Sequence, residues 1–358
     1  MAQSTIPQLD IPALPWWSVE VFRARGEGYT WQDVLMSARL RGEWDIVDAA
    51  AREGVSCAAE AAVSGTGSER ARVDDAAREF RYAHDLITAD SAERWLGRWG
   101  FGVEHWMAHF TRVILRREWA DRAAELVARH SVSQAAVAAA ALVDAICGGH
   151  LRRLARLLAD HVAAPVPPTG VPEAGHETAA LIATAADAAR ADRWPAMAPA
   201  RMTALVDVDR RYRAYGSHTV TPASLAEHVG TRQLDWTRFE CRALAFRSAD
   251  GASEAALCLR EDGLPLAELA RRASTVVQDS TFFLEELDAA VHDRFVGART
   301  GDLIGPVRQN GEYVLYEIVG KTLPSPSDPI VLVRAQEGVL KRAIAHQVAN
   351  HVQWTAEP

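Results

Sequence analysis

The sequence is poor in cysteine and has no long hydrophobic run. Its 358 residues contain four widely separated cysteines: Cys57, Cys147, Cys241 and Cys258. This number and spacing argue against a disulfide framework or a zinc ribbon, and they favour a reducing compartment in which free cysteines pack as small core residues. No window approaches the roughly twenty consecutive apolar residues that span a bilayer, because the most apolar segment, Ala135 to Cys147, is short.

Positive charge is also limited. The chain has 47 acidic and 39 basic residues, which gives a formal net charge of -8. This balance gives no electrostatic reason to expect a nucleic acid or an anionic membrane as a partner. The N-terminal stretch MAQSTIPQLDIPALPWW is interrupted by prolines and lacks the basic cluster and unbroken apolar core of a signal peptide. We therefore expect a cytoplasmic protein with no membrane and no nucleic-acid partner.

Motifs for common catalytic chemistry and for metal binding are missing as well. The chain has no Gly-x-Ser-x-Gly elbow, phosphate-binding loop or Gly-x-Gly-x-x-Gly turn. His105 and His109 are spaced to share one face of a helix, but a zinc site needs a third ligand that the sequence does not identify. Cys147 and His150 are better explained as a helix terminus than as a nucleophile and its base. We predict no metal site and no cofactor.

The first half of the chain has a helical pattern. Apolar residues recur at helical spacing from Trp31 to about Arg129, and the segment Ser131 to Asp160 is so rich in Ala, Leu and Arg that it favours a pair of helices. A proline-rich loop near residues 163–175 is the longest loop signal. We predict an N-terminal arm over residues 1–30, followed by a helical domain over residues 31–232.

Tryptophan is unusually frequent in this half. The chain has 11 tryptophans, and Trp95 and Trp99 are one helical turn apart, so they are spaced to share a face. These side chains either form a cradle for an amphipathic partner peptide or belong to a tryptophan-rich core.

Two ten-residue runs in the chain resemble each other. Thr88 to Gly97 and Thr221 to Gly230 have threonine, serine and glycine in matching places. They are either a degenerate repeat or two helices that begin with the same kind of cap.

The pattern changes at Asp235. The segment Arg238 to Phe246 alternates like a half-buried strand, Ser253 to Ser274 predicts two helices joined by an Asp-Gly turn, and Glu312 to Val319 predicts a strand entered through an Asn-Gly hairpin turn. These elements make a compact α+β unit. Apolar residues at four-residue spacing then predict a final helix within residues 323–358.

The segment from residue 238 to residue 315 resembles the parvulin (PpiC/rotamase) domain. The resemblance rests on the first strand, the A-x-x-x-L-x-x-D-G turn that ends at Gly263, the L-A-x-x-A-S run that ends at Ser274, and the Gly-Pro-Val, hairpin and Gly-x-Tyr sequence before the last strand. It implies a parvulin-like domain over residues 233–322. A helical front, this domain and a closing helix are together similar to SurA-like chaperones, in which the last helix packs on the N-terminal domain and would bring Trp354 towards the front half.

The chain departs from the family at the catalytic positions. Parvulins carry one histidine in the first strand and another in the last, whereas here Arg242 or Ala243 stands at the first position and Val314 at the second. Neither substitute supports the family's buried hydrogen-bond network. Cys241 lies beside the first position, without an imidazole neighbour to lower its pKa. We expect a degenerate isomerase fold with a retained apolar groove and no catalytic residues, although the question of enzymatic activity stays open.

A groove of this kind can bind an extended peptide. The peptide would add main-chain hydrogen bonds to a sheet edge, and aromatic residues would supply much of the binding energy. An alternative is that most of the aromatic residues belong to the core. The candidate peptide-binding residues are Phe239, Cys241, Phe246, Phe282, Phe283, Tyr313, Val314, Tyr316, Trp95 and Trp99.

A parvulin-like pattern with a SurA-like front and no signal sequence resembles the peptide-binding proteins of crocagin-type maturation systems. The resemblance implies a non-catalytic protein that binds a ribosomally made precursor peptide and presents it to modifying enzymes during natural-product biosynthesis. Two alternatives stay open: a cytoplasmic chaperone or weak peptidyl-prolyl isomerase, and a catalyst of peptide cyclisation that pre-organises its substrate. The expected partners are the precursor peptide and peptide-modifying enzymes, and a second copy of the chain, as a homodimer, is a further candidate.

Overall fold

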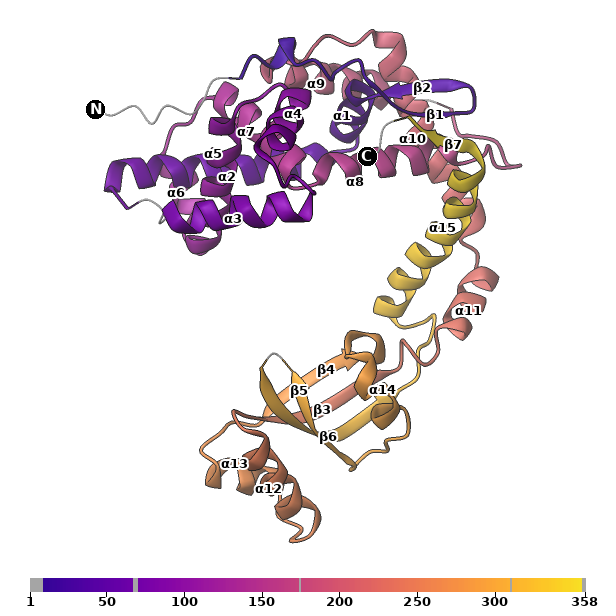
Figure 1. Ribbon diagram of the computed structural model, residues 1–358. Helices are drawn as coiled ribbons and strands as arrows, with labels where there is room; N and C mark the ends of the chain where they lie inside the picture. The colour runs from indigo at the N-terminus through magenta and orange to yellow at the C-terminus, as the bar shows by residue number, and fades with distance from the viewer. Residues whose placement is uncertain (1–8, 67–69, 174, 310, 356–358) are drawn as a thin grey trace. The chain divides into compact units, whose positions relative to one another are not determined.

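The chain folds into two compact units. The computed structural model describes residues 9–66, 70–173, 175–309 and 311–355 (Figure 1). Unit 1 comprises Met1–His218 together with Ile344–Pro358, and unit 2 comprises Thr219–Ala343. Helices dominate both units, and each unit also has a small antiparallel sheet, so the chain belongs to the α+β class.

Unit 1 is built mainly from helices. The pair of helices expected over Ser131 to Asp160 is present as α7 and α8, and α2 packs against α5, α6 and α7. The helices of unit 1 are η1 (Ile11–Ala13), α1 (Trp31–Leu40), α2 (Glu43–Ser64), α3 (Arg70–Ala83), α4 (Ala89–Trp99), α5 (Val103–Glu118), α6 (Ala123–Arg129), α7 (Gln134–Cys147), α8 (His150–Ala163), α9 (Glu177–Ala191) and α10 (Pro199–Thr219).

No single helix among the described residues has both the length and the hydrophobicity needed to cross a bilayer. Only α7 and α8 taken together meet both criteria, and the chain bends by 78° at the break between them.

Tryptophan rings lie at the centre of the unit 1 core. Trp16 stacks on Trp17 with 4.7 Å between the ring centroids, and it meets the edge of Trp99 at 5.7 Å. Trp99 also contacts Trp31 at 5.6 Å and Trp95 at 6.4 Å. Edge-to-face pairs of this kind add about 0.5–1.5 kcal/mol each beyond the area they bury. These contacts make Trp99 and Trp95 part of the core packing, although both are only half-buried.

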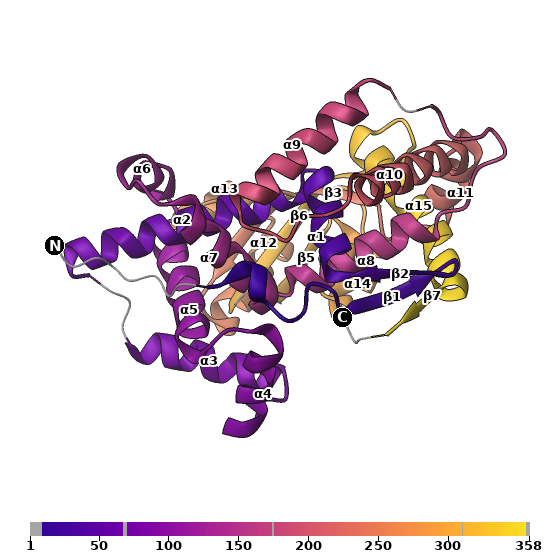
Figure 2. The ribbon, with the colours of Figure 1, turned by 90° about the horizontal axis from the view of Figure 1, so that it is seen from above.

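A three-stranded sheet joins the two ends of the sequence within unit 1. Its order is β2 (Glu27–Thr30), β1 (Glu20–Ala24) and β7 (Val352–Trp354), and the strands lie side by side in both views (Figure 1, Figure 2). Trp354 lies opposite Phe22, with 5.3 Å between the rings. The sequence therefore placed Trp354 correctly beside the front half, but the helix expected over this segment ends at His351 and a strand follows it.

The two similar runs noted in the sequence share a helix cap. At the start of α4, Ser91 N donates to Thr88 Oγ1 at 3.1 Å, and Thr88 N donates to Ser91 Oγ at 3.1 Å. Thr221 and Ser224 make the same reciprocal pair at the start of α11 (Pro222–Thr231). The matching threonines and serines thus satisfy the same free N–H groups at both helix starts.

A buried ionic cluster holds α5 against α7. His109 Nδ1 lies 2.7 Å from Asp144 Oδ1, and Arg112 donates to both oxygens of the same carboxylate. His105, its neighbour on α5, accepts a bond from Gly102 N instead. No group of three or more His, Cys, Asp or Glu that could hold a metal is found among the described residues. The helical pair of histidines therefore serves helix packing and capping here.

Unit 2 has a four-stranded antiparallel sheet in the order β4, β3, β6, β5. The strand expected over Arg238 to Phe246 forms with those bounds, and the two expected helices and the final strand also form. A further strand and helix, β4 and α14, lie between them in the chain. Asn310 of the predicted hairpin turn lies outside the described residues. The elements are β3 (Arg238–Phe246), α12 (Ala249–Arg260), α13 (Leu266–Arg272), β4 (Gln278–Phe283), η2 (Leu284–Glu286), α14 (Ala289–Val296), β5 (Leu303–Gln309) and β6 (Glu312–Thr322).

The last helix, α15 (Pro329–His351), packs differently from the expectation. Val331, Ala335 and Val339 form an apolar stripe that meets Leu225 and Val229 of α11 within unit 2. Only the part of the helix from Ile344 onward belongs to unit 1. The apolar stripe of the closing helix thus packs on α11 within unit 2.

Replacing Asp144 by asparagine should destabilise unit 1 strongly. Burial alone would raise the pKa of Asp144, but the charge of Arg112 and the hydrogen bond from His109 lower it to about 2 from an ordinary value of 3.8. The ionised carboxylate therefore stabilises the fold above about pH 4 by roughly 2 kcal/mol, and this contribution is lost as the pH falls towards 2.

Urea unfolding followed by tryptophan fluorescence measures this effect. The loss in D144N should exceed about 2 kcal/mol at pH 7 and shrink towards pH 3. Asp75→Asn is the control, because Asp75 pairs with Arg78 on the surface and such pairs contribute at most about 1 kcal/mol. Equal effects of the two variants would show that the cluster does not hold the helices together.

Candidate functional site

The two faces of the unit 2 sheet carry different side chains. Along β3, Phe239, Cys241 and Ala243 belong to one buried cluster, and Leu244 belongs to another. The first cluster includes Phe295 of α14, and the second includes residues of α12 and α13. We call the first of these surfaces the α14 face. Alternation along the paired strands thus separates the two clusters, and helices cover both.

The α14 face contains the positions at which the parvulin resemblance places histidines. Ala243 lies opposite Tyr316 in the pairing of β3 with β6, and Val314 precedes Tyr316 by two residues on the same strand. Arg242, the alternative for the first position, is exposed, and its Nη2 lies 2.8 Å from Glu317 Oε2. Of these positions, Ala243 and Val314 lie with the α14 cluster, and Arg242 lies outside it.

Four aromatic rings close the α14 face. Phe295 lies 5.4 Å from Phe239, 5.6 Å from Phe282 and 5.6 Å from Tyr316. Phe282 is also 5.7 Å from Tyr316 and stacks on Phe239 at 6.2 Å. Phe295 is fully buried. The apolar surface that the sequence suggested as an open groove is thus largely filled, at this point, by a side chain of α14.

The polar groups within this cluster are not activated. Burial raises the pKa of Cys241 to about 12, so its thiol stays protonated at neutral pH. Burial and the neighbouring Cys241 also raise the pKa of Tyr316, whose hydroxyl donates to Gln309 Oε1. Both groups are buried and their pKa values are shifted away from neutrality, so neither has the character of a catalytic acid, base or nucleophile at neutral pH.

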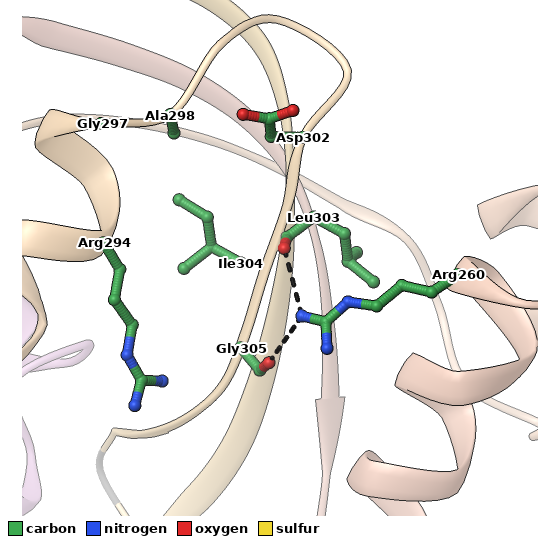
Figure 3. Close-up of a pocket in the computed structure, with 8 residues that line it drawn as sticks. All are labelled: Arg260, Arg294, Gly297, Ala298, Asp302, Leu303, Ile304 and Gly305. Carbon is green, nitrogen blue, oxygen red and sulfur yellow. Dashed lines mark hydrogen bonds between the residues drawn. The ribbon is translucent and has the colours of Figure 1, made fainter.

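A pocket of about 520 Å³ opens beside the α14 face. Residues 297–298 after α14 and residues 302–305 of β5 and the turn before it form its walls. Arg294 of α14 and Arg260 of α12 approach the same stretch of β5 from two sides, and Ile304 lies between them (Figure 3). This pocket combines the apolar side chains of Ala298, Leu303 and Ile304 with two guanidinium groups, and its accessible lining is mostly polar.

A β-bulge shapes the wall that β5 contributes. Ile304 pairs with Tyr316 and Val307 pairs with Val314, so two residues of β5 lie opposite one residue of β6. Gly305, one of the two, has φ +125°, and a Cβ at this position would lie 2.6 Å from the Val314 carbonyl oxygen. Only glycine fits this position without a shift of the backbone.

Arg260 is anchored to the bulged strand. Its Nη2 donates to the carbonyl oxygens of Leu303 and Gly305, at 3.3 and 3.2 Å (Figure 3). The nearby carboxylate of Asp302 accepts a bond from Arg299 N at 2.7 Å. Among the residues that the structure describes, neither Arg260 nor Arg294 forms an ion pair. The pocket therefore holds two guanidinium groups that no carboxylate neutralises by direct contact.

The structure divides the ten candidate peptide-binding residues between the two units. Trp95 and Trp99 lie in unit 1 and the other eight lie in unit 2. The buried members are Phe239, Cys241, Phe283 and Tyr316, and the half-buried members are Phe246, Phe282, Tyr313, Val314, Trp95 and Trp99. Within unit 2, Phe246 lies with the α12–α13 cluster, Phe283 lies with the α15 stripe, and Phe239, Cys241, Phe282, Val314 and Tyr316 share the α14 face.

Sequence reasoning missed the residues that line the pocket. Arg260 and Arg294 are far apart in the chain, and each belongs to an ordinary amphipathic helix. The Gly-Pro pair at residues 305–306 was noted for the family resemblance, and it was the one local signal of an irregular strand at this place. The pattern of charge in the sequence could not have shown that these two arginines line one pocket.

Comparisons with known proteins give little beyond this geometry. No protein-family model matches the chain, and no curated protein matches it. Among solved structures, the chain is similar to one of two related SurA-like chaperones of Campylobacter jejuni, the virulence factor PEB4 and the periplasmic protein Cj1289. The identity is 10% and the TM-score is 0.18, and the match covers 60% of this chain and 89% of that chain. A similarity of this size carries no argument about function.

Proposed function

We propose that this protein binds extended peptides without isomerising them, and that its client is a ribosomally made precursor peptide which it presents to modifying enzymes. The α14 face carries the proposal. By the sequence resemblance, Arg242 or Ala243 stands at one histidine position and Val314 at the other, and all four strands of the sheet are present. A fold that lacks its catalytic groups while its framework is complete is best explained by a surface that still binds.

The energetics of isomerisation argue against catalysis on this face. Rotation about an X–Pro bond has a barrier of about 20 kcal/mol, so a catalyst must hold the twisted amide in an organised polar site. Here Phe295 and its neighbouring rings occupy the face, and Cys241 carries a neutral thiol. These groups contribute packing energy to unit 2 and offer the amide no charge or directed hydrogen bond.

The pocket beside β5 is the best candidate for peptide binding. Ligand sites are typically concave and have a few well-placed polar groups, and this pocket combines Leu303 and Ile304 with two arginines. Arg260 already occupies the carbonyls of Leu303 and Gly305. We therefore place the peptide in the pocket through a side chain or a chain end, rather than as a strand added along this part of β5.

The narrower assignment to a precursor peptide is supported by the sequence resemblance to crocagin-type peptide-binding proteins. The geometry supports peptide binding in general.

Calorimetry tests the proposed function. The full chain at about 100 μM, a concentration suited to weak binding, should release or absorb heat when titrated with the precursor peptide encoded beside its gene. A peptide of the same composition in shuffled order is the control and should bind less tightly. An absence of heat with both peptides would contradict the proposal.

A protease-coupled proline-peptide assay tests the absence of catalysis. The protein should leave the isomerisation rate at its uncatalysed value, and Cys241→Ala should have no effect, because the native thiol is protonated. An accelerated rate that disappears in C241A would identify an isomerase and overturn the non-catalytic assignment.

A further inference from the structure

Two arginines that form no ion pair among the described residues line the pocket beside β5. Many arginines of this unit are already engaged by carboxylates within ion-pair distance: Arg232, Arg238, Arg242, Arg271, Arg272 and Arg334. Among the described residues, Arg260 and Arg294 have no such partner, although both line one pocket. Because both guanidinium groups line the same pocket, their positive charge favours an anionic ligand there.

Arg260 is held in place before any ligand arrives. Its Nη2 is committed to the carbonyls of Leu303 and Gly305, and the other N–H groups of the guanidinium have no partner in the described part of the chain. A planar guanidinium with free N–H groups matches a carboxylate geometrically. Because the anchoring bonds already fix the Arg260 side chain, this side chain loses less conformational entropy when a ligand binds.

The walls of the pocket indicate what is attached to the anion. Ala298, Leu303 and Ile304 are apolar, and a volume of about 520 Å³ exceeds the needs of a carboxylate alone. Asp302 also lines the pocket, and its negative charge disfavours a doubly charged group such as phosphate more than a singly charged carboxylate. The pocket therefore fits a carboxylate with an apolar residue beside it.

We infer that this pocket is a carboxylate-binding subsite for the peptide client. Arg260 and Arg294 bind either the C-terminal carboxylate or the side chain of an aspartate or glutamate, and Ala298, Leu303 and Ile304 contact the adjoining apolar side chain. This inference rests on the proposed function and specifies the kind of peptide that the site accepts.

Fluorescence anisotropy with the full chain tests the inference. The labelled probes are Gly-Gly-Ser-Leu-Leu as the free acid, the same peptide as the C-terminal amide, and the amides of Gly-Gly-Leu-Glu-Leu and Gly-Gly-Leu-Gln-Leu. Tighter binding of the free acid than of its amide assigns the subsite to a chain end. Tighter binding of the glutamate peptide than of the glutamine peptide assigns it to an acidic side chain.

Substitution of the arginines gives the second readout. Arg294→Gln should weaken binding of the preferred carboxylate probe by about fivefold, because it removes one of the two partners of the anion. Arg260→Gln should do the same. Arg247→Gln removes an equal charge from an exposed position outside the pocket and should change the affinity less than about twofold.

Three outcomes overturn the inference, and they are distinguishable. If the free acid binds no tighter than its amide and the glutamate peptide binds no tighter than the glutamine peptide, or if R294Q and R260Q match R247Q, the carboxylate subsite is wrong while the peptide-binding function stands. If none of the probes binds and the precursor peptide also gives no heat, both the inference and the proposed function fail. If a phosphoserine analogue of the glutamate peptide binds more than tenfold tighter than the glutamate peptide, the assignment to a carboxylate is wrong.

Discussion

The pairing of β3 with β6 is the interaction on which unit 2 depends. These two central strands carry β4 and β5 on their outer edges, and their side chains divide the interior into the α14 face and the α12–α13 cluster. The register sets Ala243 against Tyr316, whose ring lies 5.6 Å from that of Phe295 in the same buried cluster. A shift by one residue would exchange the two faces, because side chains alternate along a strand. The pocket exists because β5 is held in this register and bulges at Gly305.

The same alternation explains why the α14 face is a core. A buried polar network is stable only when every member is satisfied, and this face is filled instead by an aromatic cluster. Cys241 is a packing residue in this cluster, and burial keeps its thiol neutral. Arg260 and Arg294 line the pocket beside β5.

Local patterns in the sequence predicted the elements of unit 2 well. Alternation gave both bounds of β3, and turn signals separated α12 from α13, because these features depend on neighbouring residues. The pairing of Trp354 with Phe22 was not predicted as a strand, since three residues carry almost no periodic signal. The core position of Phe295 and the shared pocket of Arg260 and Arg294 depend on tertiary packing. Phe282 could be named in advance because it is aromatic and Val314 because of its place in the family motif, whereas the pocket could not.

The central claim is that unit 2 binds a peptide beside β5 and keeps the α14 face as a core. Hydrogen–deuterium exchange of the full chain, measured with and without saturating precursor peptide, tests this claim most directly. Slower exchange should appear at the end of α14 and along residues 297–309, and β3 and β6 should be equally slow in both states because their amides are paired in the sheet. Protection confined to unit 1, with no change at residues 297–309, would contradict the account.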